Sequence, residues 1–232
     1  MDKGIASRSS LYPFRSDFTQ YVPGGEHMTR AVLMLFLGTT VLYGLFQKKL
    51  LPHGVSKMAS KFLFWPTLPI TLALRYGNLF TAIDDTVILG TAPVGFLGHP
   101  KELYDRGVRG VINMCTEYAG PQDAYMKLGI KQLRLPTVDH FEPSFESMQD
   151  GVEFIKEFQK RGEKVYIHCK AGHGRAASVA LCYYMKAHPE LSAEDCNSRL
   201  YKIRKIRPTL FKQKNVKRFK EYVDTKAKKS KE

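Results

Sequence analysis

Residues 165–175, with the sequence VYIHCKAGHGR, constrain the fold more than any other part of the chain. A short apolar run ends in His168-Cys169, five residues with two glycines follow, and Arg175 then opens the nearly all-apolar stretch 176–187. This order predicts a buried strand, a loop whose backbone N–H groups face an anion, and a helix whose N-terminus adds positive potential. An arginine at that position can bind two phosphate oxygens at once. The segment therefore predicts a phosphate-binding loop.

Cys169 is the candidate nucleophile of this loop. The thiolate is the attacking form of cysteine, and a helix N-terminus with nearby cations stabilises it. We expect His168 to orient the loop through hydrogen bonds to the backbone rather than to act as a base. The alternative without a catalytic role is a buried strand cysteine followed by a turn. The residues predicted to bind phosphate are Lys170, Ala171, Gly172, His173, Gly174 and Arg175.

Covalent catalysis also needs a proton donor for the leaving alcohol, and a separate loop is the natural place for it. Residues 135–143, LPTVDHFEP, follow an apolar run and contain turn-forming prolines. Asp139 is the candidate general acid, and Glu142 on the same loop is the second choice. Alternatively, both are solvated loop carboxylates.

These motifs resemble the cysteine-based dual-specificity phosphatase superfamily over residues 77–225. The resemblance implies Cys169 as nucleophile, Arg175 as phosphate clamp and Asp139 as general acid, in two steps through a phosphocysteine, with no metal or other cofactor. Residues 203–208, IRKIRP, resemble the helix-ending Arg-Pro segment of that superfamily. One departure is Ala176, where members usually carry Ser or Thr. Ser178 is two residues on and points elsewhere on a helix, so the sequence predicts a slow second step.

Extra basic groups in the loop bear on the substrate. Lys170 and His173, which we expect to be partly charged near neutral pH, suit a substrate with more negative charge than one phosphate. The loop resembles that of the tumour-suppressor phosphoinositide 3-phosphatase. Separate blocks at residues 87–90, 107–114, 117–118 and 128–139 resemble the mitochondrial phosphatidylglycerophosphatase and protein-tyrosine phosphatase family. Alternatively, both basic residues are solvated rim groups.

The four cysteines show neither metal-ligand spacing nor an extracellular disulfide framework. They fit a reducing compartment, which a thiolate nucleophile requires. Cys115 follows a short apolar run whose neighbours resemble the strand beside the catalytic loop of the phosphoinositide 3-phosphatase. We hypothesise a protective disulfide between Cys115 and Cys169 on oxidation; the alternative is a plain buried strand cysteine.

Positive charge is concentrated near the C-terminus. Residues 199–231 contain 14 Lys or Arg and two acids, a net of +12 out of +14 for the chain. Such a cluster favours an anionic membrane surface, at about 1 kcal/mol per cation. Nucleic acid is a weaker expectation, because no aromatic–basic interleaving or nucleic-acid module is visible. Residues 226–232 are predicted to form a solubilising basic tail. The sequence does not identify a protein partner.

The N-terminal part predicts a membrane anchor. Residues 31–47 carry no charge, and about 17 apolar residues is the lower limit for a span. Residues 62–74 are too short to span, contain Pro66 and Pro69, and read as an interfacial segment. A signal peptide is the alternative for the first stretch. The lysines that follow it place the catalytic domain in the mitochondrial matrix, on the inner membrane, or alternatively in the cytosol, on the endoplasmic reticulum or another membrane.

Apolar periodicity within 77–225 predicts an α/β domain with a mostly parallel central sheet flanked by helices. The expected strands are 87–89, 110–114, 130–135 and 165–168, and the expected helices are 101–106, 145–158, 176–187, 192–204 and 215–223. Residues 1–27 form an N-terminal tail and 28–76 the anchoring region. The sequence thus predicts a membrane-anchored phospholipid phosphatase. A tethered dual-specificity protein phosphatase is the second hypothesis, and a non-catalytic phospholipid-binding module the third.

Overall fold

The structure is a computed structural model that describes residues 25–48 and 50–229. It divides into two compact units, Met1–Val41 and Leu42–Glu232. Helix α1 covers Gly25–Gln47. Within the described residues it is the one helix long and apolar enough to cross a membrane, by length and composition alone, over His27–Phe46.

The second unit is built on a five-stranded mixed sheet. Its spatial order is β1-β2-β5-β3-β4, with β1 antiparallel to β2 and the remaining neighbours parallel. All four expected strands are present, within two or three residues at their ends. The edge strand β1 was not expected, because it has three residues and is half-exposed. The strands are β1 Phe80–Ala82, β2 Val87–Gly90, β3 Val108–Cys115, β4 Lys131–Thr137 and β5 Lys164–His168.

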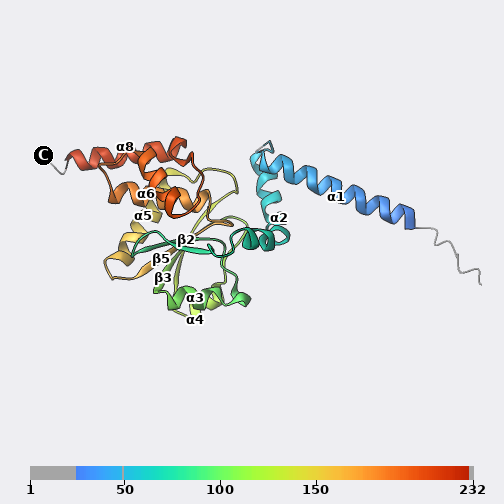
Figure 1. Ribbon diagram of the computed structural model, residues 1–232, viewed down its shortest axis with the longest axis horizontal. Coiled ribbons are helices and arrows are strands. Elements are labelled where there is room, and N and C mark those ends of the chain that lie inside the picture. The colour runs from blue at the N-terminus through green and yellow to red at the C-terminus, as the bar shows by residue number, and fades with distance from the viewer. Residues whose placement is uncertain (1–24, 49, 230–232) are drawn as a thin grey trace, which may run out of the picture. The chain divides into compact units, whose positions relative to one another are not determined.

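Helices cover both faces of the sheet, as Figure 1 shows: α3 and α4 lie on one side, and α5, α6 and α8 on the other. Ser144 and Ser192 are the N-caps of α5 and α7, because each side chain accepts a hydrogen bond from the backbone N–H three residues on. The helices are α3 His99–Asp105, α4 Gln122–Lys127, α5 Phe145–Gln159, α6 Arg175–Ala187, α7 Ala193–Ile203 and α8 Lys214–Lys229, with 3-10 turns η1 Gly95–Leu97 and η2 Leu210–Lys212.

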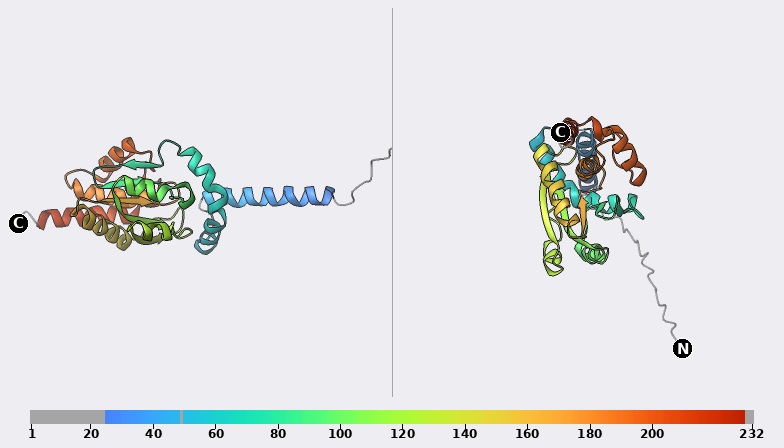
Figure 2. Two further views of the ribbon diagram at one scale, coloured as in Figure 1. Left: turned by 90° about the horizontal axis from the view of Figure 1, so that it is seen from below. Right: turned by 90° about the vertical axis from the view of Figure 1, so that its left-hand side faces the viewer.

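Helix α2, His53–Leu74, packs against the end of the sheet where β5 finishes (Figure 2). Phe64 and Leu68 are buried in the main hydrophobic core, and the Phe64 ring stacks on Tyr118 at 4.9 Å between centroids. The two prolines lie inside the helix, which bends in Figure 1 but does not end. The stretch 62–74 therefore has one face in the catalytic core, whereas the sequence suggested only an interfacial segment.

The last helix extends further than expected. Helix α8 buries Val216, Phe219 and Val223 and continues to Lys229. Residues 226–229 of the predicted basic tail are thus helical, because the amphipathic pattern carries the helix past the last buried residue. Residues 230–232 lie outside the described residues.

Candidate active site

Cys169 lies at the carboxyl end of β5, which has parallel neighbours β2 and β3 on its two sides. Crevices at this edge of a parallel sheet are where ligands bind in such folds. The loop then turns sharply at Gly172, whose φ is +63°, and a Cβ there would lie 2.4 Å from the Gly90 carbonyl oxygen. Only glycine allows this close approach. Gly174 precedes the first residue of α6, Arg175.

Arg175 is buried and held by a carboxylate that the sequence did not single out. Its Nη1 and Nη2 donate to the two oxygens of Glu117 at 2.9 and 2.8 Å, and Nη1 also donates to the Thr137 carbonyl at 2.8 Å. Both side chains of the ion pair are 2 % exposed or less. The remaining donor, Nε, is buried and has no hydrogen-bond partner among the described residues. Because an unpaired buried donor is costly, Nε is suited to an incoming anion.

The turn after β3 places Glu117. The buried Asn113 side chain accepts from the Cys115 N–H at 2.9 Å and donates to the Tyr118 carbonyl at 2.9 Å. Asn113 is also in register with His168 on the adjacent parallel strand. A signal was present in the sequence, since a carboxylate two residues beyond a strand next to β5 must emerge at the same edge as the loop.

Asp139 lies within the pocket and also contacts Arg175. Its Oδ1 is 2.9 Å from Arg175 Nη2 and accepts from the His140 N–H at 3.1 Å. Burial alone would raise the pKa of Asp139, but the Arg175 and His140 charges outweigh it and hold the pKa below its usual value. The carboxylate is therefore ionised in this arrangement.

Glu142, the second choice for the acid, has a different environment. Its Oε1 accepts from the backbone N–H groups of Asn215 and Val216 at 2.5 and 3.3 Å. These groups open α8, so the carboxylate caps that helix and lies near its positive end. The geometry thus favours Asp139 over Glu142 as the acid.

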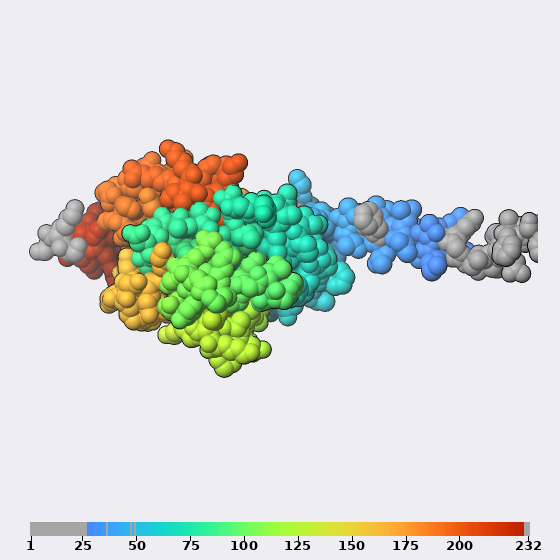
Figure 3. Space-filling model, turned by 60° about the horizontal axis from the view of Figure 1, so that its bottom comes forward, coloured from blue at the N-terminus to red at the C-terminus, as the bar shows by residue number. Residues whose placement is uncertain are grey.

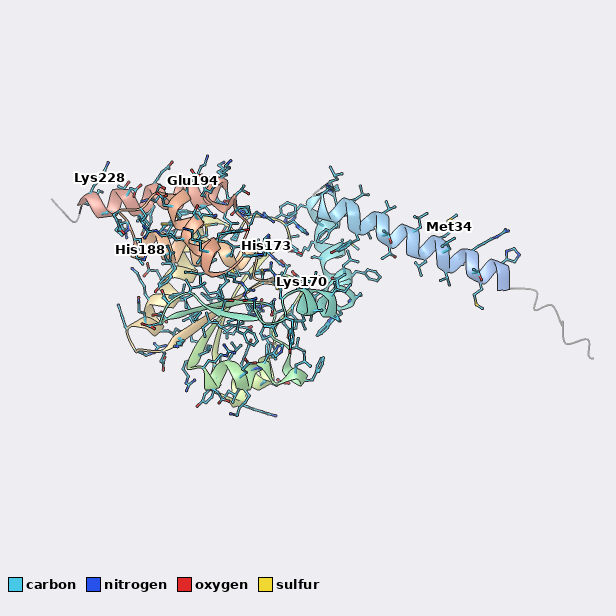
Figure 4. The ribbon with its side chains drawn as sticks, viewed as in Figure 1. Met34, Lys170, His173, His188, Glu194 and Lys228 are labelled. Carbon is cyan, nitrogen blue, oxygen red and sulfur yellow. The ribbon has the colours of Figure 1, made fainter. Side chains whose placement is uncertain are left out.

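Lys170 turns from the loop toward α2, as Figure 4 shows. Its ammonium group donates to the Thr67 hydroxyl and, at 3.5 Å, to the Leu63 carbonyl, and it lies 5.7 Å from the centre of the Phe64 ring. Burial lowers the pKa of Lys170. Helix α2, which the sequence assigned to the anchor, therefore contacts the catalytic loop directly.

Burial favours the neutral form of both histidines, His168 and His173. Burial lowers the pKa of His168 to about 3, and its Nδ1 lies 3.3 Å from the Cys169 carbonyl oxygen. Burial also lowers the pKa of His173, so the partial charge expected for it does not apply to this arrangement. His173 Nδ1 is 3.2 Å from both Arg75 Nη2 and the Lys205 carbonyl.

Arg204 holds the 169–175 loop in place through hydrogen bonds to its backbone. This buried side chain donates to the carbonyls of Ala171 and Gly172, each at 3.2 Å, and to the Asn78 carbonyl and the Thr81 hydroxyl. Residues 203–208 were noted in the sequence for their resemblance to the superfamily, but no role was predicted for Arg204. Four hydrogen bonds from one charged group join the loop to the β1 segment and the end of α7.

The remaining predicted positions surround the same loop. Ala176 is fully buried, and the Ser178 hydroxyl contacts the Gln213 side-chain oxygen at 2.8 Å and the Gly174 carbonyl at 3.2 Å. Cys115 is a buried free thiol whose pKa is raised well above normal by burial, with Arg175 opposing and Cys169 among its charged neighbours. A disulfide between Cys115 and Cys169 stays a prediction. In the described part of the chain, no cluster of three or more His, Cys, Asp or Glu side chains could hold a metal ion.

A pocket of about 220 Å³ opens on the loop. It brings together the predicted nucleophile, the arginine and the acid with side chains of α2 and the segment after α7. Its lining residues are Tyr43, Thr71, Arg75, Asp139, His140, Phe141, Cys169, Lys170, Ala171, His173, Gly174, Arg175 and Arg207.

A thiol at the end of a central parallel strand, with an arginine at the start of the following helix, is the arrangement expected of a cysteine-dependent phosphatase. Residues 96–222 match the family model described as dual specificity phosphatase, catalytic domain. The chain belongs to this family and is a cysteine-based phosphatase.

Several known proteins are similar to this chain in sequence and in structure. The chain is 36% identical over 174 residues to the human protein named phosphatidylglycerophosphatase and protein-tyrosine phosphatase 1, covering 68% of this chain and 84% of the relative. A crystal structure of PTPMT1 is 34% identical, with a TM-score of 0.57, over 65% of this chain and 99% of that one. PTPMT1 in complex with PI(5)P is 33% identical, with a TM-score of 0.57, over 64% and 99%.

Proposed function

We propose that this protein hydrolyses a phosphomonoester on a phospholipid headgroup at a membrane surface. The observation that carries the proposal is the position of α2. Its inner face lines the pocket and holds Lys170, while its outer face exposes Phe62, Trp65 and Ile70 by more than half. Figure 3 shows the surface that α2 (residues 53–74 on the colour bar) presents on one side of the molecule. Exposed aromatic and aliphatic groups with nearby lysines are typical of segments that lie in a bilayer interface.

The proposed mechanism has two steps. The Cys169 thiolate attacks phosphorus, the P–S bond forms, and the P–O bond to the alcohol breaks as Asp139 donates its proton to the leaving oxygen. Water then attacks phosphorus, Asp139 takes its proton, and the thiolate leaves with the P–S electron pair. Arg175 would bind the phosphoryl oxygens through Nε and Nη2. This requires the Asp139 carboxylate to leave Nη2, and an adjacent phosphate dianion would raise the pKa of Asp139 and favour its acid form.

Candidate substrates are phosphatidylglycerol phosphate and phosphoinositides. The names of the similar proteins support this class: the human relative is named a phosphatidylglycerophosphatase, and PTPMT1 was solved in complex with PI(5)P. We further propose residues 77–225 as the catalytic domain, residues 28–76 as the membrane-anchoring region, and the mitochondrial inner membrane, facing the matrix, as the location. The endoplasmic reticulum or another membrane, facing the cytosol, is the alternative.

The human relative is also named a protein-tyrosine phosphatase, which makes phosphoprotein the second candidate substrate. Phosphate release should be measured from phosphatidylglycerol phosphate, phosphoinositides and phosphopeptides, with the lipids in vesicles of varied anionic content. We expect lipid turnover to exceed peptide turnover and to be lost in Cys169→Ser. Faster turnover of phosphopeptides than of every lipid would replace the proposal with the second candidate.

A further inference from the structure

Two arginines of the pocket take no part in the two-step mechanism. Arg75 closes the C-terminal end of α2, and Arg207 lies in the segment after α7. Both line the same pocket as Cys169. Among the residues that the structure describes, neither forms an ion pair with an Asp or Glu side chain, whereas Arg175 is paired with two carboxylates.

Both arginines are fixed to the same loop residue. Arg75 Nη1 donates to the Lys205 carbonyl at 3.2 Å and its Nη2 lies 3.2 Å from His173 Nδ1. His173 Nδ1 also lies 3.2 Å from the Lys205 carbonyl oxygen, so it can accept from Arg75 or donate to that carbonyl, but not both at once. The backbone N–H of Arg207 donates to the His173 carbonyl at 2.9 Å. His173, labelled in Figure 4, thus contacts both Arg75 and Arg207.

The loop leaves room for a ligand at this point. A Cβ built on Gly174 would lie 3.5 Å from Arg207 Nη2, so the guanidinium lies directly beside the loop backbone. Tyr43 and Thr71 also line this pocket, and the Thr71 hydroxyl donates to the Thr67 carbonyl at 3.0 Å. Two guanidinium groups match the oxygens of a phosphate, since each can bind two of them at once.

We propose that Arg75 and Arg207 form a second anion subsite, which binds a phosphate of the substrate other than the one cleaved. This inference rests on the proposed function and narrows its substrate. The scissile phosphomonoester lies in the 169–175 loop, while the subsite takes a phosphodiester or second phosphomonoester separated from it by a short polyol. A phospholipid headgroup that ends in a phosphomonoester has this chemistry. Because Arg75 lies outside residues 96–222, which match the family model, the preceding helix supplies part of the specificity.

The test compares two soluble substrates without acyl chains. Glycerophosphoglycerol phosphate carries a phosphodiester and a phosphomonoester, and glycerol 3-phosphate carries the monoester alone. The full chain with Arg75→Gln or Arg207→Gln should lose at least about tenfold more kcat/KM on the first substrate than on the second, as for one lost charged hydrogen bond. Arg199→Gln removes an exposed arginine from α7 and should leave the ratio of the two constants unchanged.

Lysine variants serve as controls for loss of activity through misfolding. Arg75→Lys and Arg207→Lys retain the charge and should recover part of the ratio. Equal losses on both substrates, or no loss on either, would overturn the subsite. So would a loss seen only with lipid in anionic vesicles, because the arginines would then bind neighbouring headgroups. If the unaltered enzyme hydrolyses soluble glycerophosphoglycerol phosphate but no phospholipid, the subsite stands and the proposed membrane function fails.

Discussion

Asp139 Oδ1 lies 2.9 Å from Arg175 Nη2, so the candidate acid occupies a donor that a bound phosphate would need. The carboxylate therefore competes with the phosphate for the arginine, and two like charges would meet there. We expect Asp139→Asn to tighten inhibition by inorganic phosphate several-fold, since about 1 kcal/mol of repulsion is a factor of about five.

The same variant should lower kcat by about 10²–10⁴-fold on an alkyl phosphate, because general acid catalysis contributes this much. Competitive inhibition and turnover are measured on the same preparation. Glu142→Gln is the control, because that carboxylate caps α8 and should alter kcat little. A drop in kcat without tighter phosphate binding would mean that the ion pair does not oppose the substrate.

Ala176 leaves the phosphoenzyme without the hydroxyl that the superfamily usually places there. We expect a burst of product equal to the enzyme concentration, followed by slow steady turnover. Ala176→Ser should speed the steady state about fivefold, the value of one hydrogen bond of about 1 kcal/mol. Rapid-quench kinetics gives both phases, and an unchanged steady-state rate would show that the second step is limited elsewhere.

Glu117 is predicted to matter for stability and for phosphate binding. Its bidentate pair with Arg175 is almost fully buried, and breaking a buried pair costs about 3–5 kcal/mol. Glu117→Gln keeps the shape but loses the charge, and it should lower the free energy of unfolding in urea by at least about 2 kcal/mol. Glu163→Gln breaks an exposed pair with Arg161 and should cost less than about 1 kcal/mol. Equal costs would contradict the buried pairing.

Substitutions of two phenylalanines on α2 should distinguish the role of this helix in packing from its role in membrane contact. Phe64 is fully buried and Phe62 is 69% exposed. Phe64→Ala should destabilise the protein by about 3–5 kcal/mol. Phe62→Ala should alter stability by less than about 0.5 kcal/mol but weaken binding to anionic vesicles. Urea unfolding and vesicle sedimentation measure the two effects, and a Phe62→Ala protein that binds vesicles normally would exclude this face of α2 from the interface.

His168 makes stability depend on pH. Its pKa is about 3 in the folded protein and about 6.5 when unfolded, so the unfolded chain takes up more protons on acidification. The contribution of the neutral histidine is complete above pH 6.5 and falls as the pH drops toward 3, by about 2 kcal/mol at pH 5. The free energy of unfolding should decline correspondingly less between pH 7 and 5 in His168→Gln. An identical decline in both proteins would assign the pH dependence to other groups.

Local patterns were enough to predict the central part of the molecule. The strand–loop–helix at 165–187 and the helices at 145–158 and 192–204 followed from apolar periodicity, which acts over a few residues. Helix α2 was harder, because it is apolar on both faces and the sequence alone does not separate a face against protein from a face against lipid. Arg75 became part of the site only through packing of distant segments, which no local pattern encodes. Glu117 could be placed there only once β3 was known to lie beside β5.

The contact between α2 and the loop bears on inhibitor selectivity. Phosphate-mimicking compounds that bind only the 169–175 loop rely on chemistry that dual-specificity phosphatases have in common. A compound that also reached Thr71 and Arg75 would touch side chains outside the segment matching the family model. An inhibitor that contacts the α2 side of the pocket could thus distinguish this enzyme from phosphatases that share its loop.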